Sequence, residues 1–324
     1  MTVIFKIVGY GALSVIVIFF TVLIYRGISA RKMSDLEPWH DIPNSEDNLT
    51  QASYNDFSEY LAAENQFLAA IQNDVIIEET ASFNRYAPNN KSSPYVNGDN
   101  LNASFEFLPN EEEIKGGVLL VHGLTDSPYH LKAIGEIFFD NGFYVIGLRL
   151  PGHGTVPGGL LNVTWEDWYS AVKFGARMVL KKIGNRRDSK FYVGGFSTGG
   201  ALTLRYFLET SSEKLEVSNV EKHRVPDKLL LLSPAIGVNP FAEILDWHQI
   251  ISWMPWFKKF KWLEIGPEYD PFKYTSFAKS AGDQIYDLTK ANQKLIDEIT
   301  RNKSIKEKLH PICSFSCMYS DFTG

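Results

Sequence analysis

The first hydrophobic pattern in the chain is a long apolar run near its start. No charged residue occurs between Ile7 and Tyr25, and as a helix this run would be about 28 Å long, close to the hydrocarbon thickness of a bilayer. We therefore expect an uncleaved single-pass membrane anchor within residues 1–32, spanning about 7–25. A cleavable signal peptide is the alternative, although its apolar region is usually shorter and Ile28-Ser29-Ala30 is a poor cleavage site. The flanking charges leave the side of the membrane open.

Residues 33–99 are expected to form a linker that contains one amphipathic helix. The stretch 33–50 is polar and proline-containing, and within it Trp39 is expected to pack on the body of the protein. Between Tyr54 and Glu78, apolar residues recur at the three- and four-residue steps of a helix, namely Phe57, Tyr60, Leu61, Phe67, Leu68, Ile71 and Val75. The stretch 88–98 is rich in Asn, Pro and Ser and predicts a loop.

Residues 100–234 alternate between short strand patterns and helical patterns. Five runs predict strands: Ala103–Leu108, Gly117–His122, Phe143–Leu150, a run from Phe191, and Lys228–Leu232. Between them, Ser127 with Pro128 predicts the start of one helix, Gly142 its end, and Thr164 the start of another. Strands separated by helices of this length favour right-handed crossovers and an α/β fold with a mostly parallel sheet covered on both faces.

Residues 235–309 do not alternate with strands and are rich in large aromatic side chains. These are Phe241, Trp247, Trp253, Trp256, Phe257, Phe260 and Trp262, with Lys258, Lys259 and Lys261 beside them. The rings either line a pocket for an apolar ligand or form the core of a small helical subdomain, and the basic residues would suit anionic headgroups. A helix around Leu288–Ile299 and a strand over Pro311–Tyr319 are predicted to follow.

Composition and charge narrow the range of functions. The 324 residues are 44% hydrophobic and 22% charged, with a net charge of -6, so the chain is an ordinary globular protein without the basic face that nucleic-acid binding needs. Cys313 and Cys317 lie four residues apart in a predicted strand, about 13 Å between Cα atoms, which is too far for a disulfide. No pair of histidines has the close helical spacing of a zincin-type site, so neither a metal nor another cofactor is implied.

A serine framed by glycines carries the candidate chemistry. The segment Lys190–Gly200 reads as a strand, a sharp turn and a helix, and Gly195-x-Ser197-x-Gly199 fits the nucleophile-elbow pattern. A neutral serine hydroxyl is a weak nucleophile and needs an adjacent base. The motif alone has low specificity, because glycine and serine are common residues.

Two upstream motifs raise that specificity. Val121-His122-Gly123-Leu124 follows one predicted strand, and Pro151-Gly152-His153-Gly154 follows the next. Together with the serine motif they resemble the α/β-hydrolase fold, in the branch that contains monoacylglycerol lipases, carboxylesterases and serine aminopeptidase-like proteins. The resemblance covers roughly residues 100–324: a core at 100–234, a cap insertion at 235–309 above the nucleophile, and a core strand with the acid turn at 310–324.

The resemblance also implies roles for individual residues. Ser197 would be the nucleophile, the backbone N–H groups of Leu124 and Thr198 would form the oxyanion hole, and Gly195 and Gly199 would be the elbow glycines. His122 and His153 would support loops rather than act as the base. Asp321 would be the catalytic acid, with a plain turn aspartate as the alternative. The family's histidine comes after the acid, and the sequence ends at Gly324, so we expect no catalytic histidine in this chain and an incomplete triad.

The resemblance implies a serine hydrolase that cleaves carboxylic esters of hydrophobic acyl groups through an acyl-enzyme, with a lipid or other acyl ester as substrate. With the histidine missing, its activity is expected to be impaired. Two alternatives stay open: a catalytically inactive hydrolase-like membrane protein that binds a lipid or a partner, and amide, thioester or acyl-transfer chemistry on the same serine.

Overall fold

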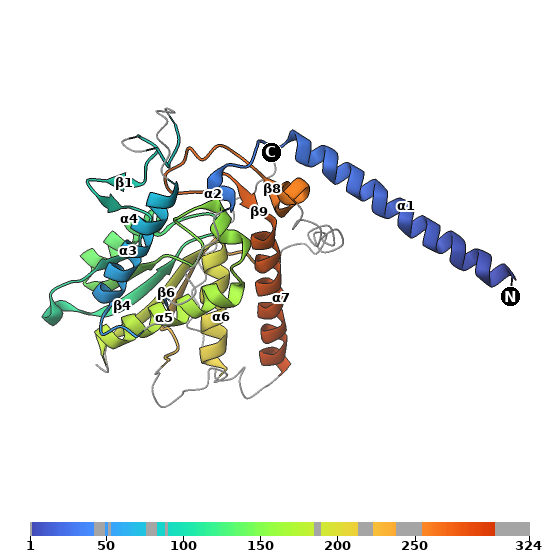
Figure 1. Ribbon diagram of the computed structural model, residues 1–324. Helices are drawn as coiled ribbons and strands as arrows, with labels where there is room; N and C mark the ends of the chain where they lie inside the picture. Colours follow the sequence, from blue (N-terminus) through green and yellow to red (C-terminus); the bar gives the residue numbers. More distant parts are fainter. Residues whose placement is uncertain are drawn as a thin grey trace.

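A mixed five-stranded sheet forms the centre of the molecule (Figure 1). The computed structural model describes residues 2–41, 49–50, 53–75, 83–87, 90–184, 189–212, 223–237 and 255–301. Within them the strand order is β3-β5-β4-β6-β7. The strands are β3 (Phe105–Phe107), β4 (Gly116–Val121), β5 (Phe143–Leu148), β6 (Lys190–Phe196) and β7 (Lys228–Leu232). Only β3 runs antiparallel to its neighbour, and the other four strands are parallel, which confirms the predicted mostly parallel sheet.

The carboxyl ends of the central strands meet at one edge of this sheet. Val121 at the end of β4 pairs with Leu148 of β5 on one side and with Gly195 of β6 on the other. All six residues of β4 are buried, as expected for a central parallel strand. The loops that carry the three sequence motifs leave the sheet at this edge, so the topology brings them together.

Helices cover both faces of the sheet. Helix α4 (Lys132–Asp140) packs on one face, where Ile134 and Phe138 contact buried side chains of β4 and β5. Helices α5 (Trp165–Ile183) and α6 (Thr198–Ser211) pack on the other face over the larger apolar core. Thr164 caps α5 in a capping box with Asp167, as the sequence predicts.

The start of the first predicted helix differs from the expectation. The chain after Ser127 forms a 3₁₀ turn, η2 (Pro128–Leu131), and the α-helix begins only at Lys132. Ser127 does not cap it, because Ser127 Oγ is buried and has no hydrogen-bond partner among the described residues, while its backbone N–H donates to Asp126. Gly142 ends the helical segment with a φ of 84°, as predicted.

The segment before the sheet is an integral part of the core. Helix α3 (Phe57–Val75) corresponds to the helix predicted over 54–78, and its Phe57 and Tyr60 belong to the main apolar cluster. Trp39, in the short helix α2 (Pro38–Asp41), is buried as expected and packs with Ile71. The predicted loop at 88–98 contains the first strand of a small hairpin. The hairpin consists of β1 (Tyr95–Val96) and β2 (Asp99–Asn100). Two further 3₁₀ turns lie within the sheet region: η1 (Glu111–Glu113) between β3 and β4, and η3 (Pro157–Leu161) between β5 and α5.

The C-terminal described segment, residues 255–301, contains two short strands that the sequence did not predict. It comprises η5 (Pro255–Lys261), β8 (Trp262–Glu264), β9 (Phe277–Ala278) and α7 (Lys279–Arg301). Helix α7 includes the helix predicted at 288–299 and packs beside α6 (Figure 1). Of the aromatic set, Phe260 and Trp262 are buried. Trp256 and Phe257 lie in η5, whereas Phe241, Trp247, Trp253 and the predicted strand with Cys313 and Cys317 lie outside the described residues.

The N-terminal helix α1 (Thr2–Lys32) extends away from the body (Figure 1). It contains one candidate membrane span, Lys6–Lys32, none of whose most apolar window is buried in the protein. By length and composition this helix is able to cross a bilayer. A signal sequence near an N-terminus has the same properties.

Candidate active site

Ser197 occupies a strained turn between β6 and α6. Its φ of 52° and ψ of -115° lie in a region that side-chain-bearing residues seldom adopt. The neighbouring chain holds this conformation: Ser197 N–H donates to the carbonyl of Leu232 (3.0 Å), and the Ser197 carbonyl accepts from the N–H groups of Ala235 (2.9 Å) and Ala201 (3.2 Å). The turn therefore presents a serine between a strand end and a helix N-terminus.

The glycines around this turn are required by close backbone contacts. A Cβ at Gly195 would lie closer than 3.0 Å to the backbone of Gly199, and a Cβ at Gly199 would lie as close to the carbonyls of Val121 and His122. Helix α6 thus begins against the end of β4 with no room for a side chain. This contact places the first N–H groups of α6 beside the loop that follows β4.

The loop after β4 lies directly against Ser197. A Cβ built on Gly123 would be 3.2 Å from Ser197 Cβ and 3.0 Å from the Phe196 ring. Leu124 follows in this loop, and Thr198 is the first residue of α6, where helical N–H groups lack intrahelical partners. Within the described part of the chain, neither Leu124 N–H nor Thr198 N–H donates a hydrogen bond. Two unpaired donors therefore come from the two segments that flank the serine.

His122 is a fixed, neutral support of this loop. Its Nε2 accepts a hydrogen bond from the Leu150 N–H (3.0 Å), so the proton resides on Nδ1, which donates to the Gly123 carbonyl (2.8 Å). Burial lowers the pKa of His122 to about 4. Because its Nε2 lone pair is already engaged, this ring joins the loops after β4 and β5 and has no free nitrogen with which to accept a proton from Ser197.

His153 lies beside His122 with similar electrostatics. The two ring centroids are 5.0 Å apart, and His153 Nδ1 hydrogen-bonds the Pro151 carbonyl (3.0 Å). Burial holds the pKa of His153 well below its ordinary value. Its Nε2 is buried and has no hydrogen-bond partner among the described residues, and the ring packs against Trp168. His153 is therefore a core residue of the loop after β5.

A charged pair closes the turn after the Leu124 loop. Asp126 is almost fully buried and contacts His130, which is half-exposed. The hydrogen bond from Asp126 raises the pKa of His130. Thr125, between Leu124 and Asp126, has a φ of 59°, so this turn is strained as well.

Two groups that sequence reasoning missed hold these loops in place. Tyr274, from the segment between β8 and β9, donates its backbone N–H to the Thr125 carbonyl (2.7 Å). Its hydroxyl donates to the Gly152 carbonyl (3.1 Å) and accepts from the Thr155 N–H (2.7 Å). Tyr274 therefore links the loop after β4 to the loop after β5. It belongs to no motif, and nothing in the sequence pattern singles it out.

The second missed group is a buried ion pair between α3 and the sheet edge. Arg149 Nε donates to Glu64 Oε1 (2.9 Å), and Arg149 Nη1 donates to the His153 carbonyl (2.9 Å). Glu64 also accepts from the Ser104 N–H (2.7 Å) and the Tyr60 hydroxyl (2.9 Å). Both charged side chains are at most 1% exposed. The sequence did carry a signal, because Glu64 lies four residues after Tyr60 on the apolar face of the predicted helix.

The described residues include only some of the groups that could act with the serine. Asp321, His248 and His310 lie outside the described residues. Of the seven histidines in the chain, the five that are described, His40, His122, His130, His153 and His223, form no hydrogen bond with Ser197. Among the described residues there is also no cluster of side chains suited to a metal ion. The described site therefore contains the serine and the two N–H donors.

Comparisons with known proteins agree with this arrangement. The family described as serine aminopeptidase, S33, matches residues 112–311. A stretch of 88 residues, 27% of this chain, is 36% identical to a thermostable monoacylglycerol lipase from Bacillus sp. (strain H-257). That stretch spans 33% of the lipase, so the chain matches about a third of this relative's length.

Two of the similar solved structures come from enzymes described as lipolytic or as a lipase. One belongs to work on LipS and LipT, two metagenome-derived lipolytic enzymes (19% identity, 60% of this chain, 70% of that chain, TM-score 0.45). Another is a soluble variant of monoglyceride lipase from Saccharomyces cerevisiae (15% identity, 62% of this chain, 67% of that chain, TM-score 0.41). Because the family match spans more than half of the sequence, we conclude that this chain belongs to the serine aminopeptidase S33 family of α/β-hydrolases.

Proposed function

We propose that the protein is a serine hydrolase that cleaves carboxylic esters of hydrophobic acyl groups, with Ser197 as the nucleophile. The observation that carries this proposal is the strained Ser197 turn, with two unpaired N–H donors, those of Leu124 and Thr198, on either side. A positive φ is strained for a residue with a side chain, and a nucleophile elbow uses this strained turn to expose the serine hydroxyl above the sheet.

The proposed chemistry is an acyl transfer in two steps. Ser197 Oγ attacks the ester carbonyl, and its proton passes to a base and then to the departing alcohol, which leaves an acyl-serine. The N–H groups of Leu124 and Thr198 would donate to the oxyanion that forms on the carbonyl oxygen. Water then attacks the acyl-serine and releases the acid. We propose Asp321 as the residue that would orient the base, and because the chain is expected to lack the family's histidine, we propose that this acyl transfer is impaired in it.

An apolar substrate suits the surroundings of the serine. Phe196, next to Ser197, has 40% of its surface exposed, and Leu124 is half-buried at the same edge. Tyr129 and Phe272 stack with ring centroids 3.7 Å apart, which joins the segment between β8 and β9 to the start of η2. The relative from Bacillus acts on monoacylglycerols by its name. We therefore propose a monoacylglycerol or similar acyl ester as the substrate class.

The domain arrangement belongs to the same proposal. We propose a hydrolase core at 100–234, a cap insertion at 235–309 and a returning strand with the acid turn at 310–324. We further propose that α1 anchors the body to a membrane, where acyl esters are found. The expected lack of a catalytic histidine concerns residues outside the described part of the chain and stays a prediction.

Hydrolysis of a monoacylglycerol by the full chain in detergent micelles tests this function. We expect slow fatty-acid release, because the catalytic histidine is expected to be missing. Ser197→Ala should abolish this release, while Ser58→Ala, which changes an exposed serine on α3, should leave the rate unchanged. A protein that binds acyl ligands with no Ser197-dependent turnover would instead be the inactive binding protein. A rate that survives Ser197→Ala would remove the proposed nucleophile.

A further inference from the structure

Among the described residues, Arg85 is a buried positive charge without a hydrogen-bonded partner. Its side chain is 1% exposed, and Nε, Nη1 and Nη2 all lack a hydrogen-bond acceptor within the described residues. A guanidinium group carries five N–H donors and stays protonated in proteins. Burying such a charge without pairing it costs several kcal/mol, so the structure calls for an acceptor at this position.

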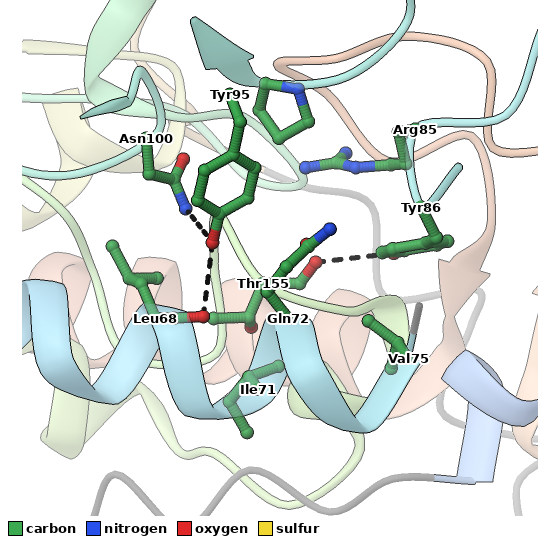
Figure 2. Close-up of a pocket in the computed structure, with 11 residues that line it drawn as sticks. Leu68, Ile71, Gln72, Val75, Arg85, Tyr86, Tyr95, Asn100 and Thr155 are labelled. Carbon is green, nitrogen blue, oxygen red and sulfur yellow. Dashed lines mark hydrogen bonds between the residues drawn. The ribbon is translucent and has the colours of Figure 1, made fainter. Parts of the chain in front are cut away.

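The Arg85 side chain reaches into a small cavity that residues of helix α3 help to line. Figure 2 shows the guanidinium of Arg85 extending from the 83–87 segment toward Tyr95, above helix α3, with Gln72 rising toward the same space. The cavity has a volume of about 10 Å³, which is room for one water-sized species. It is lined by segments distant in sequence, including Asn100 of β2 and Thr155 of the loop after β5.

The rings beside Arg85 leave its N–H edge unpaired. The guanidinium carbon is 5.1 Å from the centroid of the Tyr274 ring and 5.7 Å from that of Tyr86. Such cation–π contacts offset part of the charge through the flat face of the group. The N–H bonds lie in the plane of the guanidinium, so these contacts leave them available to an acceptor.

Several oxygen atoms around the cavity already take part in hydrogen bonds within the chain. Asn100 Oδ1 accepts from the Asn102 N–H (2.9 Å), and the Tyr95 hydroxyl accepts from the Asn100 amide (3.0 Å) and donates to the Leu68 carbonyl (3.2 Å). The Thr155 carbonyl accepts from the Tyr86 hydroxyl (3.3 Å). These groups form hydrogen bonds with one another and none with Arg85, so the guanidinium N–H groups remain available to an occupant of the cavity.

One carboxylate lies in the same region but is held by other donors. Glu268 is 1% exposed, and its oxygens accept from the backbone N–H groups of Ser276 (2.9 Å) and Thr275 (3.2 Å). Its backbone carbonyl accepts from the Arg85 N–H (2.9 Å). Within the described residues Arg85 forms no ion pair with it.

We propose that the cavity beside Arg85 binds a small inorganic monovalent anion, such as chloride. The small volume excludes organic acids and phosphate esters, and the buried cation with free N–H donors selects a negative charge. An anion here would join α3, the 83–87 segment and the loop after β5. It would also fix Arg85 against Tyr274, whose N–H holds Thr125. The site is distinct from the proposed esterase chemistry and does not depend on it.

Thermal unfolding of the full chain in detergent tests the site. We expect the midpoint to rise by a few degrees as sodium chloride or bromide replaces sodium gluconate at constant ionic strength, because a ligand that binds only the folded state stabilises it. Arg85→Met, which keeps the length but removes the charge, should abolish this rise. Lys91→Gln, an exposed cation nearby, should retain it.

Several outcomes would overturn the proposal. One is equal behaviour of the protein in halide and gluconate, and another is a halide effect that persists in Arg85→Met. If Arg85→Met does not fold, anomalous diffraction from bromide-soaked wild-type crystals decides: a bromide peak within hydrogen-bond distance of the guanidinium supports the site, and no peak refutes it. A third outcome combines two results: halide has no effect on the unfolding midpoint, and the double variant Glu78→Gln/Glu79→Gln lowers the midpoint as much as Arg85→Met does. This outcome would identify a carboxylate of the chain, and not an anion, as the partner of Arg85.

Discussion

The backbone around Ser197 is packed so closely that single atoms decide its conformation. Gly199 has the carbonyls of Val121 and His122 against the position of its missing Cβ, and Gly195 has the backbone of Gly199 there. Ser197 is left as the side chain that projects from a turn otherwise reduced to backbone. At this scale the glycines are part of the candidate site, because they set the distance between the serine and the two N–H donors.

A methyl group at position 199 tests this packing. We expect Gly199→Ala to lower the free energy of unfolding by about 1–3 kcal/mol, because the Cβ would overpack against backbone that has no room to shift. Urea unfolding measures the change. Gly282→Ala is the matched control: it lies in helix α7 with only ordinary contacts, to the Phe277 ring, and should stabilise by about 0.5–1 kcal/mol. Equal effects of the two changes would contradict this account.

The buried histidines predict a loss of stability in acid. The pKa of His122 is lowered to about 4 by burial, and that of His153 is lowered as well. Between pH 6.5 and 4 the unfolded chain therefore binds protons that the folded chain does not, so stability is present above pH 6.5 and falls as the pH drops toward 4. Urea midpoints across this range should fall, and His122→Gln should make the fall shallower.

His130 is the control of opposite sign. Its pKa is raised by Asp126, so its contribution is present below pH 6.5 and is lost as the pH rises through the raised pKa. His130→Gln should therefore lower the stability below pH 6.5 and remove the gain in stability that the wild type shows as the pH falls from the raised pKa toward 6.5. If both histidine variants change the slope in the same direction, the assigned protonation states are wrong.

At the scale of elements, the network at Glu64 attaches α3 to the loop after β5. The carboxylate accepts from Tyr60, Ser104 and Arg149, and Arg149 in turn holds the His153 carbonyl. The pattern of apolar residues correctly predicted the helix. It did not predict that Phe57 and Tyr60 of this helix belong to the main apolar cluster. Membership of the core depends on contacts between segments that are distant in sequence. The spacing of apolar residues along one helix carries no information about such contacts.

Breaking the pair from one side should be costly. We expect Glu64→Leu to lower the free energy of unfolding by about 3–5 kcal/mol, because Arg149 would remain buried without its counter-charge. Replacing both, in Glu64→Leu/Arg149→Met, should cost less than the sum of the single changes. Asp74→Asn, which alters an exposed carboxylate at the end of α3, should change stability by less than about 0.5 kcal/mol. Additive effects in the double variant would show that the two residues are not coupled.

At the scale of the whole molecule, the sequence predicted the sheet, its mostly parallel character and the three motif loops. It did so because strand and helix periods, caps and glycine turns are local. The bridge that Tyr274 makes between two loops, the hairpin at β1 and β2 and the strands in 255–301 depend on contacts that no local pattern encodes. Helix α1, by contrast, could be predicted from its apolar composition alone, because most of it makes no contact with the body of the protein.

Membrane attachment follows from that helix. We expect the full chain to stay with membranes after alkaline carbonate extraction, and a chain beginning at Met33 to be released, because α1 is the one candidate span in the described residues. The variant keeps Met33 and Asp35, which accept hydrogen bonds from Lys259. A mature N-terminus between residues 26 and 33, measured by mass spectrometry, would show that the helix is a cleaved signal sequence.

The central claim is that Ser197 is a nucleophile, and covalent labelling tests it most directly. After prolonged incubation of the full chain with a fluorophosphonate probe, which the expected lack of a histidine base makes necessary, peptide mass spectrometry should locate the adduct on Ser197. Labelling should be lost in Ser197→Ala and kept in Ser58→Ala. An adduct on another residue, or no Ser197 adduct in a folded protein, would contradict the account.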